Sequence, residues 1–273
     1  MSRKSTENKT VIITGASSGI GAALALAYGL RQANVVMGAR TVEKLGEIAR
    51  AIETEGGRAA YLACDVAKEE DCAALIGLAV REFGGMDVLI CNAGISMRAL
   101  LDDVELSVLH RLMDVNFWGT VNCVKYALPY IQASHGSIVG VSSVAGIHGL
   151  PGRTGYSASK YAMTGFLETV RVENLKKDVH VMIACPGFTA SNVRFSALTA
   201  DGSQQGESPR NEGKMMSAEE VAARIIRGVD KRKRRLLMDF EGRGSSLIKK
   251  FAPALLDRIF YNHMAKEPDS PFK

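Results

Sequence analysis

A tyrosine and a lysine stand four residues apart, at Tyr156 and Lys160. On a helix, residues at this spacing share one face, so the phenol and the ammonium can point into one pocket. A positive charge ~4 Å from a phenol, at an effective dielectric of ~20, favours the phenolate by roughly 4 kcal/mol, or about three pKa units. We expect the pair to act as an acid and base near neutral pH, which proton transfer to or from an alcohol requires.

Glycines recur near the start of the chain, at Gly15, Gly19 and Gly21, directly after the apolar run 11–13. A glycine-rich turn between a strand and a helix lets the backbone approach a pyrophosphate at the helix N-terminus. Such a turn alone is a weak signal, and so is one Tyr/Lys pair. Together they predict hydride transfer between a dinucleotide and an alcohol or carbonyl.

Further residues typical of one enzyme family lie between and after these two motifs: Asn92, Ala93, Gly94, Asn116, Ser142, Ser143, Pro186 and Gly187. In this order the set resembles the short-chain dehydrogenase/reductase family over about residues 9–240. The resemblance implies an α/β fold with a doubly wound parallel sheet (Rossmann fold), as a single domain with a C-terminal helical extension at residues 241–273. The alternative is a non-catalytic nucleotide-binding regulatory protein on the same fold, which the intact Asn/Ser/Tyr/Lys set disfavours.

The resemblance also implies the catalytic residues Asn116, Ser143, Tyr156 and Lys160. Tyr156 would exchange a proton with the substrate oxygen, and Ser143, thirteen residues earlier, would orient the substrate. Ser142 should face the opposite side of its strand. Lys160 would also bond the nicotinamide ribose, and Asn116 would interrupt a helix and hold a water that links Lys160 to solvent. The implied reaction needs no metal.

A larger set is implied for the cofactor: Gly15, Ser17, Ser18, Gly19, Ile20, Gly21, Arg40, Thr41, Asp65, Val66, Asn92, Ala93, Gly94, Tyr156, Lys160, Pro186, Gly187, Thr189 and Ser191. Enzymes that select NAD place an acid about twenty residues after the glycine turn. This chain has Arg40 there, and its planar fork can pair with a 2′-phosphate. We therefore predict NADP (NADPH), with NAD less favoured. The chain departs from the family at Thr189, where an apolar residue is common, and at Ser191, where a threonine is.

The substrate set is Ser143, His148, Leu150, Phe188, Val193 and Phe195, and Met97 and Ile147 are expected nearby. This mostly apolar lining favours a lipid, steroid, retinoid or acyl-chain alcohol or carbonyl. For His148, a structural role is an open alternative. Residues 191–216 are polar and glycine-containing, and their length and position favour a substrate lid.

The elements that must position these residues alternate short apolar runs with amphipathic stretches, which is typical of βαβ units and a parallel sheet. Strands are expected at residues 11–13, 34–39, 58–64, 88–92, 137–143, 179–185 and 236–240. Helices are expected at 20–32, 41–55, 68–83, 156–177 and 217–229, the last with Ser217 and Glu220 as a capping box. Residues 106–132 form two helices or one that changes direction near Asn116. Right-handed crossovers then put the ligands at the carboxyl ends of the strands.

Composition is that of a globular protein, with 273 residues, 47% hydrophobic and 23% charged. There is no apolar run of 18 residues and no signal peptide, which favours a cytoplasmic location. The five cysteines lack metal-ligand spacing and are expected to be reduced core residues. The basic run 231–235 has no interleaved aromatics, so no nucleic-acid partner is predicted.

Beyond the family core, apolar residues recur at helical spacing over 246–264, and Pro253 is expected to kink or divide this helix. From residue 231 onward the chain carries eleven Lys/Arg against five Asp/Glu. The apolar stripe could pack on its own protein, on a neighbouring subunit or on a membrane surface. The helix 156–177, with Ala162, Phe166 and Val170, resembles the segment through which the family forms homodimers and homotetramers.

Overall fold

A computed structural model describes residues 7–187, 189, 196–206, 215–238, 240–266, 270 and 272. Its centre is a parallel sheet in the order β3-β2-β1-β4-β5-β6-β7. The strands are β1 (Thr10–Thr14), β2 (Asn34–Ala39), β3 (Arg58–Ala63), β4 (Val88–Cys91), β5 (Ser137–Val141), β6 (His180–Cys185) and β7 (Arg235–Leu237). The order reverses between β1 and β4, which confirms the doubly wound Rossmann topology.

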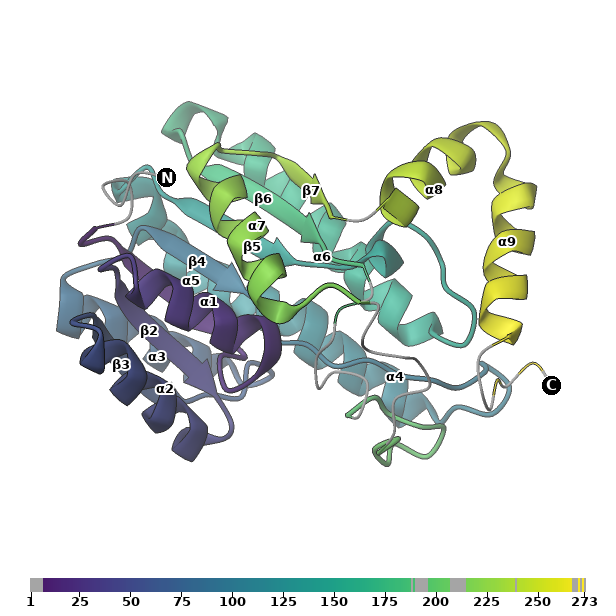
Figure 1. Ribbon diagram of the computed structural model, residues 1–273, viewed down its shortest axis with the longest axis horizontal. Coiled ribbons are helices and arrows are strands. Elements are labelled where there is room, and N and C mark those ends of the chain that lie inside the picture. Colours follow the sequence, from purple (N-terminus) through teal and green to yellow (C-terminus); the bar gives the residue numbers. More distant parts are fainter. Residues whose placement is uncertain are drawn as a thin grey trace.

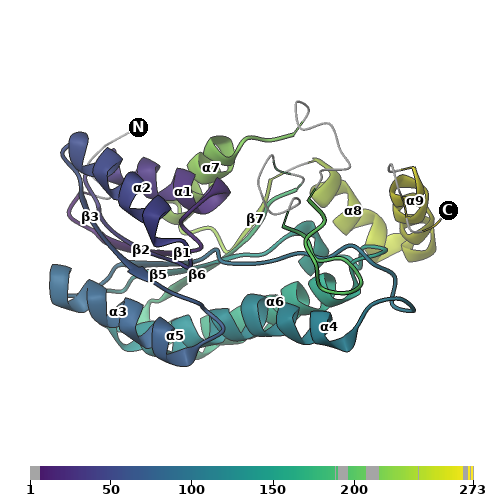
Figure 2. The same ribbon diagram turned by 90° about the horizontal axis from the view of Figure 1, so that it is seen from below.

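Helices cover both faces of the sheet, and Figure 2 shows the two layers. One layer holds α1 (Gly19–Gly29), α2 (Val42–Thr54) and α7 (Ala218–Asp230), and the other holds α3 (Glu69–Phe83), α5 (Gly119–Ala133) and α6 (Thr154–Glu173). Each layer closes its own apolar core against the sheet, one around Leu24 and Ile225 and the other around Leu75 and Leu167. Strands buried on both faces explain the near-continuous apolar runs of the sequence.

Residues 106–132, expected to form two helices or one that changes direction near Asn116, form a continuous helix with a π-helical turn inside it. α4 (Leu106–Met113) passes into a π-helical turn (Asp114–Trp118) and then into α5. Such turns release a backbone group from the regular ladder and recur at functional sites. Asn116 lies in this turn and is completely buried.

The last strand is shorter than the expected 236–240. β7 ends at Leu237, which pairs with Cys185, and Phe240 already belongs to the next helix. The residue after Cys185 is Pro186, which has no amide hydrogen to extend the ladder. β7 has β6 as its partner and therefore ends where β6 ends.

The C-terminal extension forms two helices, α8 (Phe240–Phe251) and α9 (Pro253–Ala265), which stand apart from the layered domain in Figure 1. Pro253 opens α9, where its missing amide hydrogen costs nothing, so it divides the expected helix into two. None of the described helices combines the length and apolarity needed to cross a membrane.

Candidate active site

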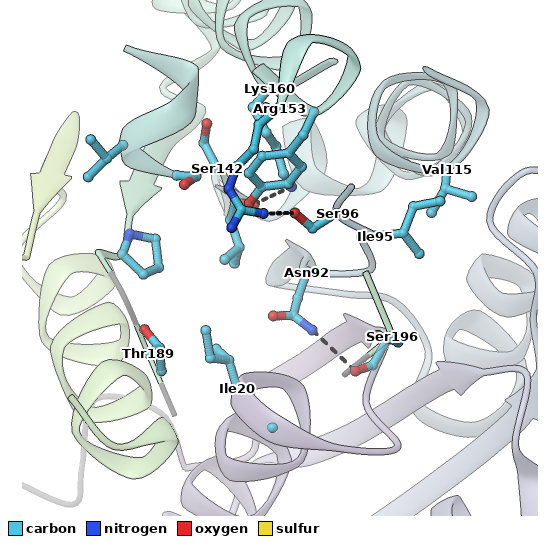
Figure 3. Close-up of a pocket in the computed structure, with 18 of the residues that line it drawn as sticks. Ile20, Asn92, Ile95, Ser96, Val115, Ser142, Arg153, Lys160, Thr189 and Ser196 are labelled. Carbon is cyan, nitrogen blue, oxygen red and sulfur yellow. Dashed lines mark hydrogen bonds between the residues drawn. The ribbon is translucent and has the colours of Figure 1, made fainter. Parts of the chain in front are cut away.

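A cavity of about 590 Å³ lies at the carboxyl ends of the strands, where a doubly wound sheet places its ligands. Its walls come from the glycine turn, the ends of β2 to β6, the start of α6 and the two C-terminal helices. Figure 3 shows Ile20 and Asn92 on one side of it, and Ser142, Arg153 and Lys160 on the other.

The glycine turn forms one end of the cavity. Gly15 and Gly19 have φ angles of 64° and 52°, which strongly favour glycine. A Cβ on Gly21 would lie 2.2 Å from the carbonyl oxygen of Gly15, so the close contact of turn and helix requires glycine there. Ser18 is the N-cap of α1, and in the described part of the chain its side chain makes no capping hydrogen bond. Its hydroxyl and the first amides of α1 fit a pyrophosphate.

Asn92 braces this turn from β4. Its Nδ2 donates to the carbonyl oxygens of Thr14, at 3.0 Å, and Gly15, at 3.2 Å. The Thr14 hydroxyl accepts from the backbone amides of Asn92 and Ala93, both at 3.1 Å. The Asn-Ala-Gly segment thus fixes the glycine turn relative to the central strands.

The ends of β2 and β3 carry the residues expected at the adenosine. Arg40 and Thr41 line the cavity and are exposed, and Thr41 is the N-cap of α2. Asp65 and Val66 also line it, and an Asp65 carboxylate oxygen accepts from the amide of Ala67 at 3.2 Å. Asp65 therefore stabilises its own turn while it faces the cavity.

Both the oxygen and the nitrogen of the Asn116 side-chain amide form hydrogen bonds with the loop after β4. Its Oδ1 accepts from the Ile95 amide at 2.9 Å, and its Nδ2 donates to the Ile95 carbonyl at 3.0 Å and the Ser159 hydroxyl at 2.9 Å. A Cβ on Gly94 would come within 3.0 Å of Asn116 Oδ1 and 3.2 Å of Lys160 Nζ. Asn116 thus lies behind the cavity wall, close to Lys160.

Lys160 is 3% exposed, and its Nζ donates to the carbonyl oxygen of Val141 at 2.9 Å. Burial lowers the pKa of Lys160 from 10.5 to about 8. Lys160 Nζ lies 6.0 Å from the centroid of the Tyr156 ring. A backbone carbonyl thus holds the Lys160 ammonium in the cavity wall near the Tyr156 ring.

Tyr156 lines the cavity beside Ser143, whose hydroxyl also accepts from the Ala145 amide at 3.2 Å. Burial raises the pKa of Tyr156 above 10, although the Ser143 hydrogen bond and the Arg153 charge act in the opposite direction. The expected phenol with a low pKa is thus not what this geometry produces. Ser142 lies one residue back, and its buried hydroxyl is 3.4 Å from that of Thr164.

The substrate end differs from the expected set. Leu150 lines the cavity, whereas His148 is 2% exposed behind the wall. Met97 and Ile147 also lie outside the lining, and Phe188, Ser191, Val193 and Phe195 fall outside the described residues. Pro186, Gly187 and Thr189 line the wall, and the Thr189 hydroxyl donates to the Gly187 carbonyl at 3.2 Å. Of the expected lid at 191–216, Ser196, Leu198 and Gln204 reach the cavity.

The two C-terminal helices close the substrate end of the cavity. Part of the apolar stripe of residues 246–264 therefore packs at the active-site mouth. The helices contribute Gly244, Ser245, Ile248, Leu256, Ile259, Phe260, His263 and Met264 to the lining. The Ser245 hydroxyl is 2.9 Å from His148 Nε2, and burial lowers the pKa of His148 to about 4. Lys249 Nζ donates to the Ile147 carbonyl and to the Tyr161 hydroxyl, both at 2.6 Å.

The sequence reasoning missed Ser96, Arg111, Val115 and Arg153, which also line the cavity. Arg153 lies before the expected helix of residues 156–177, whereas α6 begins at Thr154 and has Arg153 as its N-cap. Within the described residues, no group of His, Cys, Asp or Glu is arranged to hold a metal ion. All five cysteines are buried and free, as expected of core thiols.

Comparisons with known proteins agree with this geometry. Residues 9–201 match the short chain dehydrogenase family. The chain is 34% identical over 269 residues to dehydrogenase/reductase SDR family member 7B of Mus musculus, covering 96% of this chain and 83% of the mouse protein. It is 35% identical to an 11-beta-hydroxysteroid dehydrogenase of Pinus massoniana, over 94% of this chain and 75% of that one.

The fold has a close counterpart among solved structures. An alcohol dehydrogenase of the archaeon Thermococcus sibiricus, complexed with 5-hydroxy-NADP, superposes with a TM-score of 0.71 and 25% identity. The match covers 84% of this chain and 93% of that one. By sequence and by fold, the chain belongs to the short-chain dehydrogenase/reductase family of oxidoreductases.

Proposed function

We propose that the protein is an NADP(H)-dependent oxidoreductase that interconverts a secondary or primary alcohol and its carbonyl on an apolar substrate. The observation that carries the proposal is one continuous cavity. The glycine turn forms one end, Ser143, Tyr156 and Lys160 line the middle, and apolar residues of α8 and α9 close the other end.

In the proposed reaction, the nicotinamide supplies the hydride when it is bound, or accepts it in the reverse direction. Tyr156 donates a proton to the carbonyl oxygen during reduction and accepts it during oxidation. Ser143 donates a hydrogen bond to the same oxygen and orients it. Lys160 bonds the ribose, and Asn116 holds the loop after β4 against α6 through Ile95 and Ser159.

Charge on the cavity wall supports NADP(H) over NAD(H). Arg40, Arg111, Arg153 and Lys160 line the cavity, and Asp65 is the one carboxylate among its described lining residues. This positive excess favours the cofactor that carries an additional phosphate. Arg40 and the N-terminus of α2 lie where that 2′-phosphate would bind. The Thermococcus sibiricus relative was solved with an NADP analogue.

The substrate end supports an apolar molecule such as a lipid, steroid, retinoid or acyl-chain compound. Leu150, Leu198, Ile248, Leu256 and Phe260 face it, with Ser245, Gln204 and His263 as the polar lining. Mostly apolar walls with a few polar groups are typical of sites that bind such molecules. The 11-beta-hydroxysteroid dehydrogenase name of the pine relative is consistent with this class.

The direct test follows oxidation of NADPH, and separately of NADH, with a panel of aliphatic, steroid and quinone carbonyls. The proposal predicts turnover with at least one apolar carbonyl and a preference for NADPH. Tight NADPH binding without turnover on the whole panel would favour the non-catalytic regulatory alternative.

We further propose a homodimer or homotetramer in the cytoplasm. Tyr161 and Val172 on α6 and Trp118 beside α5 expose large apolar side chains, which is typical of association surfaces. Val170, expected on that surface, is instead buried in the core of its own chain. Buried, free thiols support a reducing compartment.

Peripheral contact with a membrane is proposed for the outer side of α8 and α9. Phe251 and Leu255 are exposed and do not line the cavity, with Lys250 and Arg258 nearby in the sequence. Apolar side chains flanked by cations suit an anionic lipid surface. An apolar substrate could then pass from the bilayer to the cavity that these helices close.

A further inference from the structure

His148 is a buried polar residue that the proposed reaction does not use. It lies between Ser143 and the start of α6, is 2% exposed and does not line the cavity. Its Nε2 lies 2.9 Å from the hydroxyl oxygen of Ser245 in α8, and its ring centroid lies 5.7 Å from that of Phe260 in α9. One buried side chain therefore contacts both C-terminal helices.

The hydrogen bond between His148 and Ser245 has a defined direction. Within the described residues, Nδ1 of His148 is buried and has no hydrogen-bond partner. A ring hydrogen on Nδ1 would therefore lack an acceptor, whereas a hydrogen on Nε2 is accepted by the Ser245 hydroxyl oxygen. Burial, and after it the Lys249 charge, lowers the pKa of His148 to about 4, so the ring is neutral near pH 7. A neutral ring thus donates from Nε2 to α8.

The loop that carries His148 is fixed to the elements that hold the reacting residues. The His148 amide donates to the carbonyl of Val144, the residue after Ser143, at 3.0 Å. The Leu150 amide donates to the hydroxyl of Ser157, on the first turn of α6, at 3.2 Å. His148 is therefore held in place relative to Ser143 and to α6, between which the carbonyl group of the substrate would react.

The inner face of α9 lines the cavity instead of an apolar core. Its buried residues Leu256 and Met264 both belong to the cavity wall and to none of the described apolar cores. A wall that faces a cavity lacks the close packing on all sides that fixes a core helix. The contacts of His148 therefore have a large share in deciding where α8 and α9 stand.

We propose that His148 is a positioning residue that determines substrate size. It anchors α8 and α9 to the loop before α6, fixes the distal wall of the cavity and makes the enzyme prefer long apolar carbonyls to short ones. This inference rests on the proposed function and narrows the substrate class of the same site. A long chain reaches Ile248, Leu256 and Phe260 in the distal wall and buries apolar surface there, whereas a short chain does not.

The test compares the reduction of decanal and of propanal by NADPH in the full-length wild type and in His148→Ala. Loss of the anchor should raise KM for decanal about tenfold, the size expected when one buried hydrogen bond is lost. KM for propanal and kcat for both aldehydes should stay within about twofold, because Ser143, Tyr156 and Lys160 are unchanged. The control His110→Ala removes an exposed histidine of α4 outside the cavity lining and should leave all values unchanged.

Two further variants separate the anchor from general support of the loop. His148→Phe keeps a ring against Phe260 but has no donor for Ser245, so it should also raise KM for decanal and serves if His148→Ala does not fold. His148→Gln keeps a donor near the position of Nε2 and should restore this KM to within about threefold of the wild type. Equal losses with propanal, or an unchanged KM for decanal in a folded Ala or Phe variant, would show that the proposal is wrong.

Binding separates failure of this proposal from failure of the proposed function. If the wild type reduces no carbonyl of the panel, the proposed function fails, and the Kd of decanal for the protein with NADP⁺ takes the place of KM. That Kd should rise about tenfold in His148→Ala if His148 anchors the wall. An unchanged Kd, or a wild type that treats decanal and propanal alike, would overturn the proposal.

Discussion

At the scale of single residues, the site depends on charges held where water cannot reach them. Lys160 is buried, and its ammonium donates to the Val141 carbonyl. A buried cation is costly unless its hydrogen bonds are made, and the cost appears as a lowered pKa. Lys160 therefore contributes function at the expense of stability near neutral pH.

This cost predicts a pH dependence of stability. Burial lowers the pKa of Lys160 from 10.5 to about 8, so between these pH values the unfolded chain binds more protons than the folded one. The free energy of unfolding should rise with pH across this window by on the order of 2 kcal/mol from Lys160. Urea unfolding of wild type and Lys160→Met at pH 8 and pH 10 measures it, and parallel changes in the two proteins would contradict it.

Arg40 carries a second residue-scale prediction, on cofactor choice. Arg40→Asp replaces the partner of a 2′-phosphate with a repelling charge, so the ratio of kcat/KM with NADPH to that with NADH should fall at least about tenfold. Arg50→Asp makes the same charge change on the exposed side of α2 and should leave the ratio unaltered. An unchanged ratio in Arg40→Asp would assign the 2′-phosphate to other residues.

At the scale of elements, α8 and α9 complete the cavity, and polar contacts of α8 join them to the rest of the described chain. Ser245 meets His148, and Lys249 donates to Ile147 and Tyr161. Lys249 also lies 5.1 Å from the centre of the Tyr161 ring. Lys249 thus joins the extension to the loop before α6 and to α6 itself.

Removing that side chain should loosen the extension. Lys249→Ala is expected to speed amide exchange in residues 240–265 and to raise KM for an apolar carbonyl, because the cavity loses a fixed wall. Lys250→Ala changes the adjacent exposed residue and should leave both quantities near the wild-type values. Equal exchange in the two variants would show that apolar contacts alone hold these helices.

The sequence predicted the helices and strands better than it predicted which distant residues pack against them. Apolar periodicity predicted most strands and helices, and the capping-box pattern predicted the Ser217 cap, whose hydroxyl accepts from the Glu220 amide at 3.1 Å. The end of β7 depends on where β6 stops, and the burial of His148 depends on Ser245, 97 residues away. Such long-range packing has no local pattern.

At the scale of the whole molecule, the proposed membrane contact makes a simple prediction. The exposed apolar residues of α8 and α9 and the basic C-terminal region should bind anionic liposomes at low salt, and added salt should weaken the binding. Flotation of full-length protein with vesicles rich in phosphatidylserine measures this. The variant Phe251→Ser/Leu255→Ser should bind less. If the full-length protein does not float with anionic vesicles at low salt, the proposed membrane contact is wrong.

The central claim is that this cavity transfers a hydride and a proton, with Tyr156 as the proton-transfer residue. Its most direct test compares Tyr156→Phe with wild type, using NADPH and the best carbonyl from the panel. We predict a loss in kcat of about 10²-fold or more, with the Kd for NADPH changed less than about twofold. The substitution removes the proton that Tyr156 transfers but changes the volume of the side chain very little. Tyr126→Phe, at a half-buried tyrosine of α5 that does not line the cavity, is the control and should keep full activity. A Tyr156→Phe enzyme that retains more than about a tenth of the wild-type rate would contradict the claim.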